Sequence, residues 1–364
     1  MRVATRLVRV DPEHPDPAVL REAGETIRRG GLVAFPTETV YGLGADALSD
    51  RAVRRIFEAK GRPSDNPLIV HVASVEGAMS VAHPDPRGRW HALASRFWPG
   101  PLTLVLPRRD NVSKLVTAGL DTVAVRMPRH PVALGLIKAA GVPIAAPSAN
   151  RSGRPSPVEA SHVMDDLDGR VEWVLDGGPT GVGVESTVLD LSGDPPVVLR
   201  PGGIGVEALR EALTRVDVLS LEAPPPGPVR SPGLKYRHYA PRAPVVVMEG
   251  PSEWVARRVQ ERIEQMQAGG RPVRLGLFFT DETLELLRSL RVLPRPGVWV
   301  VSAGPRDDLA EVARRLFGAL RELDCQRPAL ILAEAVANRG VGLAINNRLR
   351  RAAAGRVDRP FAQP

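Results

Sequence analysis

The 364-residue chain contains a single cysteine, Cys325, and no long uninterrupted run of apolar residues. One cysteine excludes an intramolecular disulfide framework and any zinc site built from several cysteines. A membrane-spanning helix needs roughly 18 or more consecutive apolar residues, and no run approaches that length. The first residues, MRVATRLVRVDPEHPDP, lack the apolar core and cleavage site of a secretory signal. We therefore expect a cytoplasmic protein that makes no contact with a membrane.

Lysine and aromatic residues are also scarce. Lysine occurs only at positions 60, 114, 138 and 235, so arginine supplies nearly all of the positive charge behind the net charge of +8. Excess positive charge suits an anionic partner such as a nucleotide or RNA, although an arginine-rich proteome produces the same composition. Aromatic residues make up 4% of the chain, which argues against extensive base-stacking platforms for single-stranded nucleic acid.

Proline is concentrated in residues 222–244, which hold seven prolines and two glycines and are typical of an extended linker. The middle of this segment, SPGLKYRHYAP, carries charge and two of the three tyrosines, which a simple spacer does not require. The composition therefore predicts a domain over residues 1–221, a linker or lid over 222–244, and a second domain over 245–364. The chain length also agrees with two domains, because a domain typically has roughly 150 residues.

In the first domain, apolar runs alternate with amphipathic stretches, which is typical of an α/β fold. Helices are predicted over 17–29 and 49–60, and the segment from Ser156 to Glu159 has the pattern of a capping box that starts another. Some strands follow one another without an intervening helix, so we expect a twisted, open, mixed sheet. The predicted strands span 32–35, 68–72, 102–106, 122–125, 142–145, 171–175, 187–191 and 197–199.

In the second domain, strands and helices alternate regularly. This order predicts a small Rossmann-like α/β domain with a parallel sheet. The predicted strands span 244–248, 273–279, 298–301 and 330–333, and the predicted helices span 252–267, 282–290, 307–323 and 343–353.

The loop over residues 36–44 follows a predicted strand and ends in Gly-x-Gly-x-x-Ala. A dinucleotide-binding fingerprint needs its first glycine directly after the strand, whereas six residues intervene here, so NAD binding is not predicted. Thr37 and Thr39 offer hydroxyl groups to a small polar substrate. A tight turn with capping threonines is the alternative.

The next motif is basic. Lys60 and Arg62 stand at a predicted helix end, where Gly61 and Pro63 restrict the backbone and direct both cations to one spot. Converging lysine and arginine suit a polyphosphate, because the guanidinium binds two oxygens at once. The alternative is that both cations complement the helix dipole. His71 ends the following strand, where a histidine buried in the core is the alternative to a ligand-binding one.

Three further loops carry polar or glycine-rich sequence. Residues 145–156 leave a predicted strand and offer Ser148, Asn150 and Ser156, and loops at carboxyl ends of strands bind ligands in open α/β sheets. The segments 176–187 and 200–203 are rich in glycine, which suits anion binding by backbone N–H groups as well as ordinary turns. The sequence has no Walker A motif, no Gly-x-Ser-x-Gly elbow and no His-Glu-x-x-His helix. Any chemistry should therefore rest on positioning and charge stabilisation.

Seven of these segments, taken in order, resemble the YrdC-type family, and more narrowly the long, two-domain threonylcarbamoyl-AMP synthases. They are FPTETVYGLG, KGRPSDNPLIVHV, FWPGPLTLVL, TVAVRMP, APSANRSGRPSP, GVESTVLDL and LRPGGI, and they span residues 32–204. The segment SPGLKYRHYAP and the terminal GVGLAINNRLRRAA resemble the long form specifically. Each motif is weak alone, whereas the ordered set is highly specific.

The resemblance implies a nucleotidyltransferase that converts L-threonine, bicarbonate or CO2, and ATP into L-threonylcarbamoyl-AMP and pyrophosphate. Partner proteins of the tRNA-threonylcarbamoyl transferase machinery then modify the adenosine next to the tRNA anticodon. It also implies a YrdC-like N-terminal domain with a basic concave surface, followed by a Rossmann-like domain.

The resemblance further assigns roles to single residues. Mg²⁺ is expected on the ATP phosphates rather than in a dedicated metal site. A lid over the pocket is expected from Lys235, Tyr236, His238 and Tyr239. Catalytic roles are expected for Lys60 and Arg62. Contacts to L-threonine are expected from Thr39, His71, Arg126, Ala146 and Ser186. Contacts to ATP are expected from Arg62, Asn66, Thr122, Ser148, Asn150, Ser156, Arg200, Tyr236 and His238.

The main alternative is a non-catalytic protein of the same fold that binds tRNA or double-stranded RNA through its positive charge. A carbamoyl-adenylate enzyme that uses carbamoyl phosphate is a second alternative. Its larger relatives carry zinc fingers, which a single cysteine excludes here.

Overall fold

The computed structural model describes residues 3–219, 238–270 and 272–360. These residues form two compact units, one with residues up to 152 and 156–219, the other with residues 153–155 and those from 238 onward. Most of the predicted linker, Lys235 and Tyr236 included, lies outside the described residues. Within the described ranges, no helix is both long and apolar enough to cross a bilayer.

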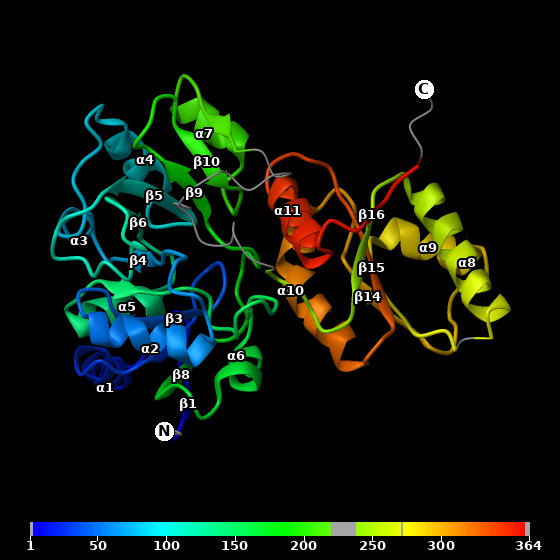
Figure 1. The fold of residues 1–364 in the computed structure, drawn as a ribbon, viewed down its shortest axis with the longest axis horizontal. Coiled ribbons are helices and arrows are strands. Elements are labelled where there is room, and N and C mark those ends of the chain that lie inside the picture. Colours follow the sequence, from blue (N-terminus) through cyan, green and yellow to red (C-terminus); the bar gives the residue numbers. More distant parts are fainter. Residues whose placement is uncertain (1–2, 220–237, 271, 361–364) are drawn as a thin grey trace. The chain divides into compact units, whose positions relative to one another are not determined.

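The N-terminal unit is built on one mixed sheet (Figure 1), as the direct succession of several strands predicted. Its described strands number eleven, in the order β1-β8-β2-β3-β7-β4-β6-β5-β9-β10-β11. Strand β4 runs parallel to β6, whereas β5 runs antiparallel to β6. The strands are β1 (Arg6–Arg9), β2 (Val33–Phe35), β3 (Gly42–Asp46), β4 (Ile69–His71), β5 (Leu102–Pro107), β6 (Thr122–Arg126), β7 (Ile144–Ala145), β8 (Trp173–Asp176), β9 (Thr187–Asp190), β10 (Val197–Arg200) and β11 (Asp217–Val218).

The helices of this unit cover the sheet. Helix α1 begins after the capping Asp16, whose side chain accepts a hydrogen bond from the Ala18 N–H. Its buried face packs beside α5 and over strands β2, β7 and β8. The helices are α1 (Pro17–Arg28), α2 (Asp50–Lys60), α3 (Val75–Met79), α4 (Arg89–Phe97), α5 (Pro131–Ala140), α6 (Ala160–Leu167) and α7 (Val206–Ala212).

Two sequence interpretations of this unit are wrong. The glycine-rich end of the 36–44 loop is strand β3, which pairs with β2 and β7. A Cβ on Gly44 would come within 2.8 Å of Phe35 and Ile144, so glycine is required where three strands pack closely. The capping box is also absent. Helix α6 begins after Glu159, which makes no side-chain cap, and Ser156 bonds a carboxylate instead.

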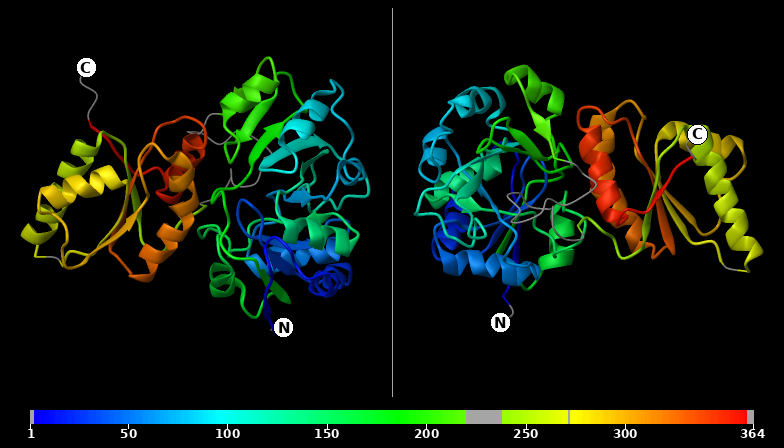
Figure 2. Two further views of the ribbon diagram at one scale, coloured as in Figure 1. Left: turned by 180° about the vertical axis from the view of Figure 1, so that it is seen from behind. Right: turned by 45° about the horizontal axis from the view of Figure 1, so that its top comes forward.

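The C-terminal unit is the predicted parallel α/β domain. Its helices cover both faces of the sheet, with α8 and α9 on one face and α10 and α11 on the other, as both views of Figure 2 show. The strands are β12 (Val245–Met248), β13 (Leu275–Phe279), β14 (Val298–Ser302), β15 (Leu330–Glu334) and β16 (Val357–Asp358). The helices are α8 (Ser252–Ala268), α9 (Asp281–Ser289), α10 (Leu309–Cys325) and α11 (Gly342–Ala352).

The strand order of this sheet differs from the usual Rossmann arrangement. The described order is β14-β13-β15-β12-β16, so β15 lies between the first two strands of the domain. In the usual order the first and second strands are neighbours. The expectation of a parallel α/β domain is therefore confirmed, and its connectivity is a variant that periodicity alone does not reveal.

Residues at the start of this unit pack into it. The Tyr239 ring stacks on Phe317 with centroids 5.4 Å apart, and the Arg348 guanidinium lies 5.3 Å from the same ring. Arg348 is fully buried. Tyr239, expected in a lid, is therefore part of the C-terminal core among the described residues.

Close packing between α1 and α5 gives a stability prediction. A Cβ on Gly24 would lie 2.7 Å from the Ala139 carbonyl carbon, and backbone atoms cannot rotate away. We expect Gly24→Ala to destabilise the N-terminal unit by about 1–3 kcal/mol, despite the higher helix propensity of alanine. Chemical unfolding measures this, with Glu25→Ala on the same helix as control. An unchanged or raised unfolding free energy would contradict the packing.

Candidate functional site

The segment of residues 37–43 connects the other predicted motifs through backbone hydrogen bonds. The carbonyls of Glu38 and Thr39 accept from the N–H groups of Val182 and Gly183, at 2.8 and 3.1 Å. Further along, the Leu43 N–H donates to Pro147, and the Tyr41 carbonyl accepts from Ala149, both at 2.8 Å. Two loops that are far apart in sequence, around residues 148 and 182, are thereby fixed to one segment.

Lys60 joins the 148–150 loop to the end of α2. The ammonium is buried and donates to the carbonyls of Ser148 and Asn150, each at 2.5 Å. The Ser148 hydroxyl in turn donates to the Asn150 side-chain oxygen at 2.5 Å. Helix α2 ends at Gly61 in the left-handed region, with φ of 60°. Three residues predicted as one site therefore meet, and the Lys60 charge is held by carbonyl oxygens.

Arg62 and Asn66 lie in the turn that follows. The half-buried Arg62 guanidinium donates to the carbonyls of Asn66 and Pro67, at 3.3 and 3.2 Å. The Asn66 side chain is 2% exposed, yet neither its oxygen nor its nitrogen has a hydrogen-bond partner among the described residues. An unsatisfied buried amide costs about 1–3 kcal/mol, so this amide is an expected contact point for a ligand.

Arg126 ends β6 and is 3% exposed. Its Nε donates to the Gly100 carbonyl at 3.2 Å, and its Nη1 donates to the Thr39 hydroxyl at 2.9 Å. Its Nη2 lies 2.8 Å from Oε2 of Glu38. That contact lacks hydrogen-bond geometry, so Nη2 and both Glu38 oxygens make no hydrogen bond within the described part of the chain. The pair therefore retains hydrogen-bonding capacity for a ligand.

His71 faces Arg126 across the parallel strands β4 and β6, where the two residues are in register. Burial, together with repulsion from the nearby guanidinium, lowers the pKa of His71 to about 3. The imidazole is therefore neutral at physiological pH. A neutral ring can donate or accept one hydrogen bond beside Arg126 without adding a second positive charge.

Arg200 and Ser186 form another contact at the ends of β10 and β9. The Arg200 Nη2 donates to the Ser186 carbonyl at 3.0 Å and to its hydroxyl at 3.3 Å. The same hydroxyl lies 2.7 Å from the Thr103 hydroxyl on β5. Arg200 is 6% exposed. The structure thus places Arg200, which was predicted to contact ATP, in direct contact with Ser186, which was predicted to contact L-threonine.

The register of β4 and β6 separates the predicted residues into two groups. Arg126 and His71 lie at the carboxyl ends of these strands. Asn66 precedes β4, and Thr122 begins β6 as a half-buried residue, so both lie at the amino ends. Ala146, 4% exposed, donates its N–H to the carbonyl of Ile69 at the start of β4. Thr122 and Arg126 are four residues apart on β6, so at about 3.3 Å per residue their backbones lie about 13 Å apart.

Two carboxylates were missed by the sequence reasoning. Glu185 accepts from the buried Ser156 hydroxyl at 2.5 Å, and Glu38 faces Arg126. Both lie inside motifs quoted above, and their burial beside polar partners is a tertiary property. Within the described ranges no group of three or more His, Cys, Asp or Glu side chains could hold a metal ion. His238 belongs to the C-terminal unit and Tyr236 lies outside the described residues.

Comparison with known proteins identifies the family. A family model described as "Telomere recombination" matches residues 25–202, and one described as "Threonylcarbamoyl-AMP synthase, C-terminal domain" matches residues 204–354. A threonylcarbamoyl-AMP synthase of Pyrococcus abyssi is 48% identical over 342 residues, covering 93% of this chain and 95% of the relative. The chain belongs to the threonylcarbamoyl-AMP synthase family.

Other members agree over nearly the full length. The threonylcarbamoyl-AMP synthase of Bacillus subtilis is 49% identical over 350 residues, covering 94% of this chain and 95% of that protein. The crystal structure of P. abyssi Sua5 complexed with L-threonine superposes with a TM-score of 0.90 at 46% identity, covering 98% of this chain and all of the other. The family resemblance and the fold class are confirmed. The individual binding roles stay predictions.

The neutral state of His71 predicts that the free energy of unfolding depends on pH. Unfolding returns the histidine to a pKa near 6.5, so below that pH the unfolded chain binds a proton that the folded chain does not. As the pH falls from about 6.5 towards 3, this group alone removes about 1.4 kcal/mol of stability per pH unit.

Hydrogen exchange of the β4 and β6 segments measures this local stability. We expect His71→Gln to flatten its decline between pH 6.5 and 4, relative to the unmodified chain. His83→Gln, at an exposed histidine, serves as the control and should leave the decline unchanged. Parallel pH profiles for His71→Gln and the unmodified chain would show that His71 is not held neutral by folding.

Proposed function

We propose that this chain is an L-threonylcarbamoyladenylate synthase, which forms threonylcarbamoyl-AMP and pyrophosphate from L-threonine, bicarbonate or CO2, and ATP. The family supports this, because full-length relatives bear the name of that activity. The P. abyssi relative was crystallised with L-threonine, which supports the amino-acid substrate. The product serves the tRNA-threonylcarbamoyl transferase machinery, which modifies the adenosine next to the anticodon and places the reaction in the cytoplasm.

The observation that carries the proposal is the Arg126–Glu38 pair. A buried guanidinium already faces a carboxylate at 2.8 Å, although the geometry leaves both groups short of hydrogen bonds in the described part of the chain. A free carboxylate can bind a guanidinium through two parallel hydrogen bonds, which a tethered one cannot reach here. The L-threonine carboxylate therefore replaces Glu38 at Nη2, and the Thr39 hydroxyl lies 2.9 Å from Nη1 beside it.

When the substrate carboxylate displaces Glu38 from Arg126, Glu38 lies next to the substrate ammonium group. This ammonium then replaces Arg126 as the positive charge that faces Glu38. Glu38 accepts one ammonium proton, and the resulting amine attacks CO2. The new N–C bond forms as a C=O π bond opens, and the second nitrogen proton passes to bicarbonate or water, which leaves the carbamate. Because His71 is neutral, it does not compete with Arg126 for the carboxylates at this end of the strands.

The adenylation step follows while the amino-acid carboxylate stays at Arg126. A carbamate oxygen attacks the α-phosphorus of ATP, and the bond to the bridging oxygen breaks as pyrophosphate leaves. Arg62 stabilises the charge on the phosphate oxygens, while Lys60 holds the 148–150 loop and its serine and asparagine in place. Mg²⁺ enters with ATP as part of the substrate. The amide of Asn66 and the hydroxyl of Thr122 are proposed nucleotide contacts.

The direct test is mass spectrometry of the products after incubation with ATP, L-threonine, bicarbonate and Mg²⁺. We expect threonylcarbamoyl-AMP and pyrophosphate only when all are present. If RNA is bound with steep salt dependence and no threonine-dependent pyrophosphate is released, the non-catalytic alternative holds instead.

Removal of the Arg62 charge gives a quantitative test. We expect Arg62→Ala to lower the turnover number by about 10²–10³, because one preorganised charge stabiliser is lost. Threonine-dependent pyrophosphate release measures the rate. The matched control is Arg54→Ala, at an exposed position on α2, which should retain the rate of the unmodified chain. Equal rates for both variants would refute the role of Arg62.

Glu38→Gln separates the two tasks given to Glu38. The amide cannot take the amine proton, so kcat should fall by about 10²–10⁴. The KM for L-threonine should not rise, because the internal competitor for Arg126 has lost its charge. Activity should recover as the pH is raised and more substrate amine is deprotonated in solution. A raised threonine KM with no pH recovery would leave Glu38 a purely structural partner of Arg126.

A further inference from the structure

The four sheet edges of the described chain are protected to different degrees. Exposed strand edges pair with other chains unless they are short, charged or interrupted by proline. Strand β1 carries Arg6 and Arg9, and β11 and β16 span two residues each with an aspartate in both. Strand β14 has five residues, Val-Trp-Val-Val-Ser, with no charge and no proline. In the described chain it pairs only with β13.

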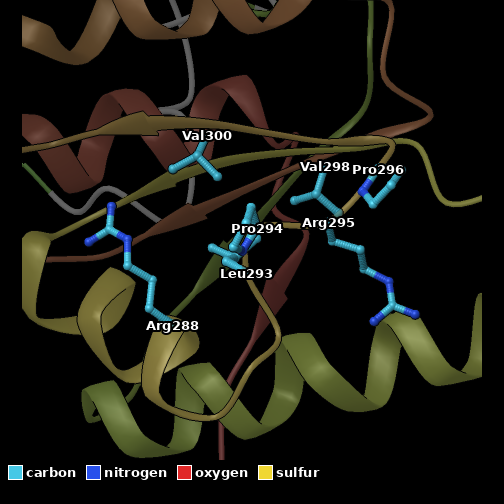
Figure 3. Close-up of a pocket in the computed structure, with 7 residues that line it drawn as sticks. All are labelled: Arg288, Leu293, Pro294, Arg295, Pro296, Val298 and Val300. Carbon is cyan, nitrogen blue, oxygen red and sulfur yellow. The ribbon is translucent and has the colours of Figure 1, made fainter.

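Strand β14 is also the wall of a groove of about 660 Å³ (Figure 3). Val298 and Val300 line it from the strand, and Leu293 and Pro294 line it from the connection between α9 and β14. No residue of β14 is fully buried, and Val300 is 37% exposed. Four large hydrophobic residues are exposed in the described chain, and two of them, Leu290 and Val300, lie in or next to this connection. Such clustering marks an interaction surface.

Two arginines stand at opposite ends of this groove. Figure 3 shows Arg288 at one end, from α9, and Arg295 at the other, from the connection. Neither guanidinium has an ion pair or hydrogen bond within the described residues, whereas Arg258, Arg306 and Arg315 of the same unit all bind carboxylates. The groove thus presents an apolar floor between two uncompensated positive charges. Its complement is an apolar segment that carries carboxylates.

The charges also decide between the possible occupants. In a two-fold dimer the same patch meets itself, so the two arginines of one copy would face those of the other. RNA would bind through stacking on aromatic side chains as well as charge, and the groove lining contains no aromatic residue. We propose that the β14 edge and this groove bind an extended, acidic peptide segment of a partner protein.

In this arrangement the peptide adds a strand to the open edge of β14. Its backbone supplies hydrogen bonds, and alternate side chains point into the groove. Five residues of β14 span about 16 Å, enough for two inward apolar side chains. Carboxylates at the two ends of the segment, on the same face as the inward apolar side chains, meet Arg288 and Arg295. This surface lies wholly within the C-terminal unit and does not depend on the proposed synthase activity.

The test measures binding of a fluorescein-labelled heptapeptide to the full-length protein by fluorescence anisotropy. The peptide has glutamate at positions 1 and 7, valine at positions 3 and 5, and serine elsewhere, so that both glutamates and both valines share one face of the strand. We expect a Kd on the order of 10–100 μM, the weak end of the range for small interfaces. The same peptide with lysine in place of glutamate should not bind. Amide exchange over Val298–Ser302 should slow when the acidic peptide is present.

Two variants separate the groove from general charge attraction. Arg288→Glu with Arg295→Glu should weaken binding about tenfold or more, whereas Arg257→Glu, at an exposed position on α8 outside the lining, should change it little. Val300→Lys adds a positive charge, so simple electrostatic attraction would strengthen binding, whereas loss of the apolar floor weakens it. Circular dichroism confirms that each variant folds.

Four results would overturn the proposal. These are no binding of the acidic peptide, equal binding of the lysine peptide, tighter binding by Val300→Lys, and unchanged binding by the double arginine variant. Two further results would replace it. A concentration-dependent dimer lost in Val300→Lys would assign the edge to a second copy of this chain. Binding of a single-stranded RNA oligonucleotide that is lost in the double arginine variant would assign it to RNA.

Discussion

Buried positive charge is the constraint around which the N-terminal unit is organised. Within the described part of that unit, Lys60, Arg126 and Arg200 are each less than a tenth exposed, and each is surrounded by oxygen atoms of loops that leave the sheet. A buried cation without such oxygens would cost several kcal/mol. The loops around residues 100, 148 and 186 therefore cannot move independently of the cations that they solvate.

This arrangement explains how a site can be rigid and yet prepared for anionic substrates. The backbone carbonyls that accept hydrogen bonds from these cations carry no formal negative charge. Glu38, in contrast to a carbonyl, offers Arg126 a full negative charge in poor hydrogen-bond geometry. In the proposed function, the substrate carboxylate makes the missing hydrogen bonds and displaces Glu38 from the same guanidinium. Preorganisation of this kind lowers the cost of orienting charge during reaction.

The C-terminal unit is also rich in arginine, and there several arginines form ion pairs with carboxylates. The buried Glu334, for example, accepts from Thr280, Thr283 and Arg306. That network joins three loops at the carboxyl end of the sheet and leaves no acceptor capacity unused. Arg288 and Arg295 beside the groove make no such pair within the described residues.

Local sequence was sufficient for most elements and for the family. Apolar runs bounded by glycine and proline identified strands such as β5 and β6, since buried strands must be apolar regardless of their neighbours. The ordered motifs identified the family. Strand β3 was predicted as a loop because of its glycines, which are required by close packing against the neighbouring strands around residues 33 and 144. The prediction of a capping box at Ser156 was wrong for a related reason, because the Ser156 hydroxyl bonds Glu185, which is 29 residues away.

Only the tertiary structure decided several other features, because they depend on residues distant in the chain. These are the partners of Lys60, Arg126 and Ser156, the strand order of the C-terminal sheet, and the uncovered edge of β14. No local pattern encodes them, since long-range packing alone determines which polar groups share a buried space.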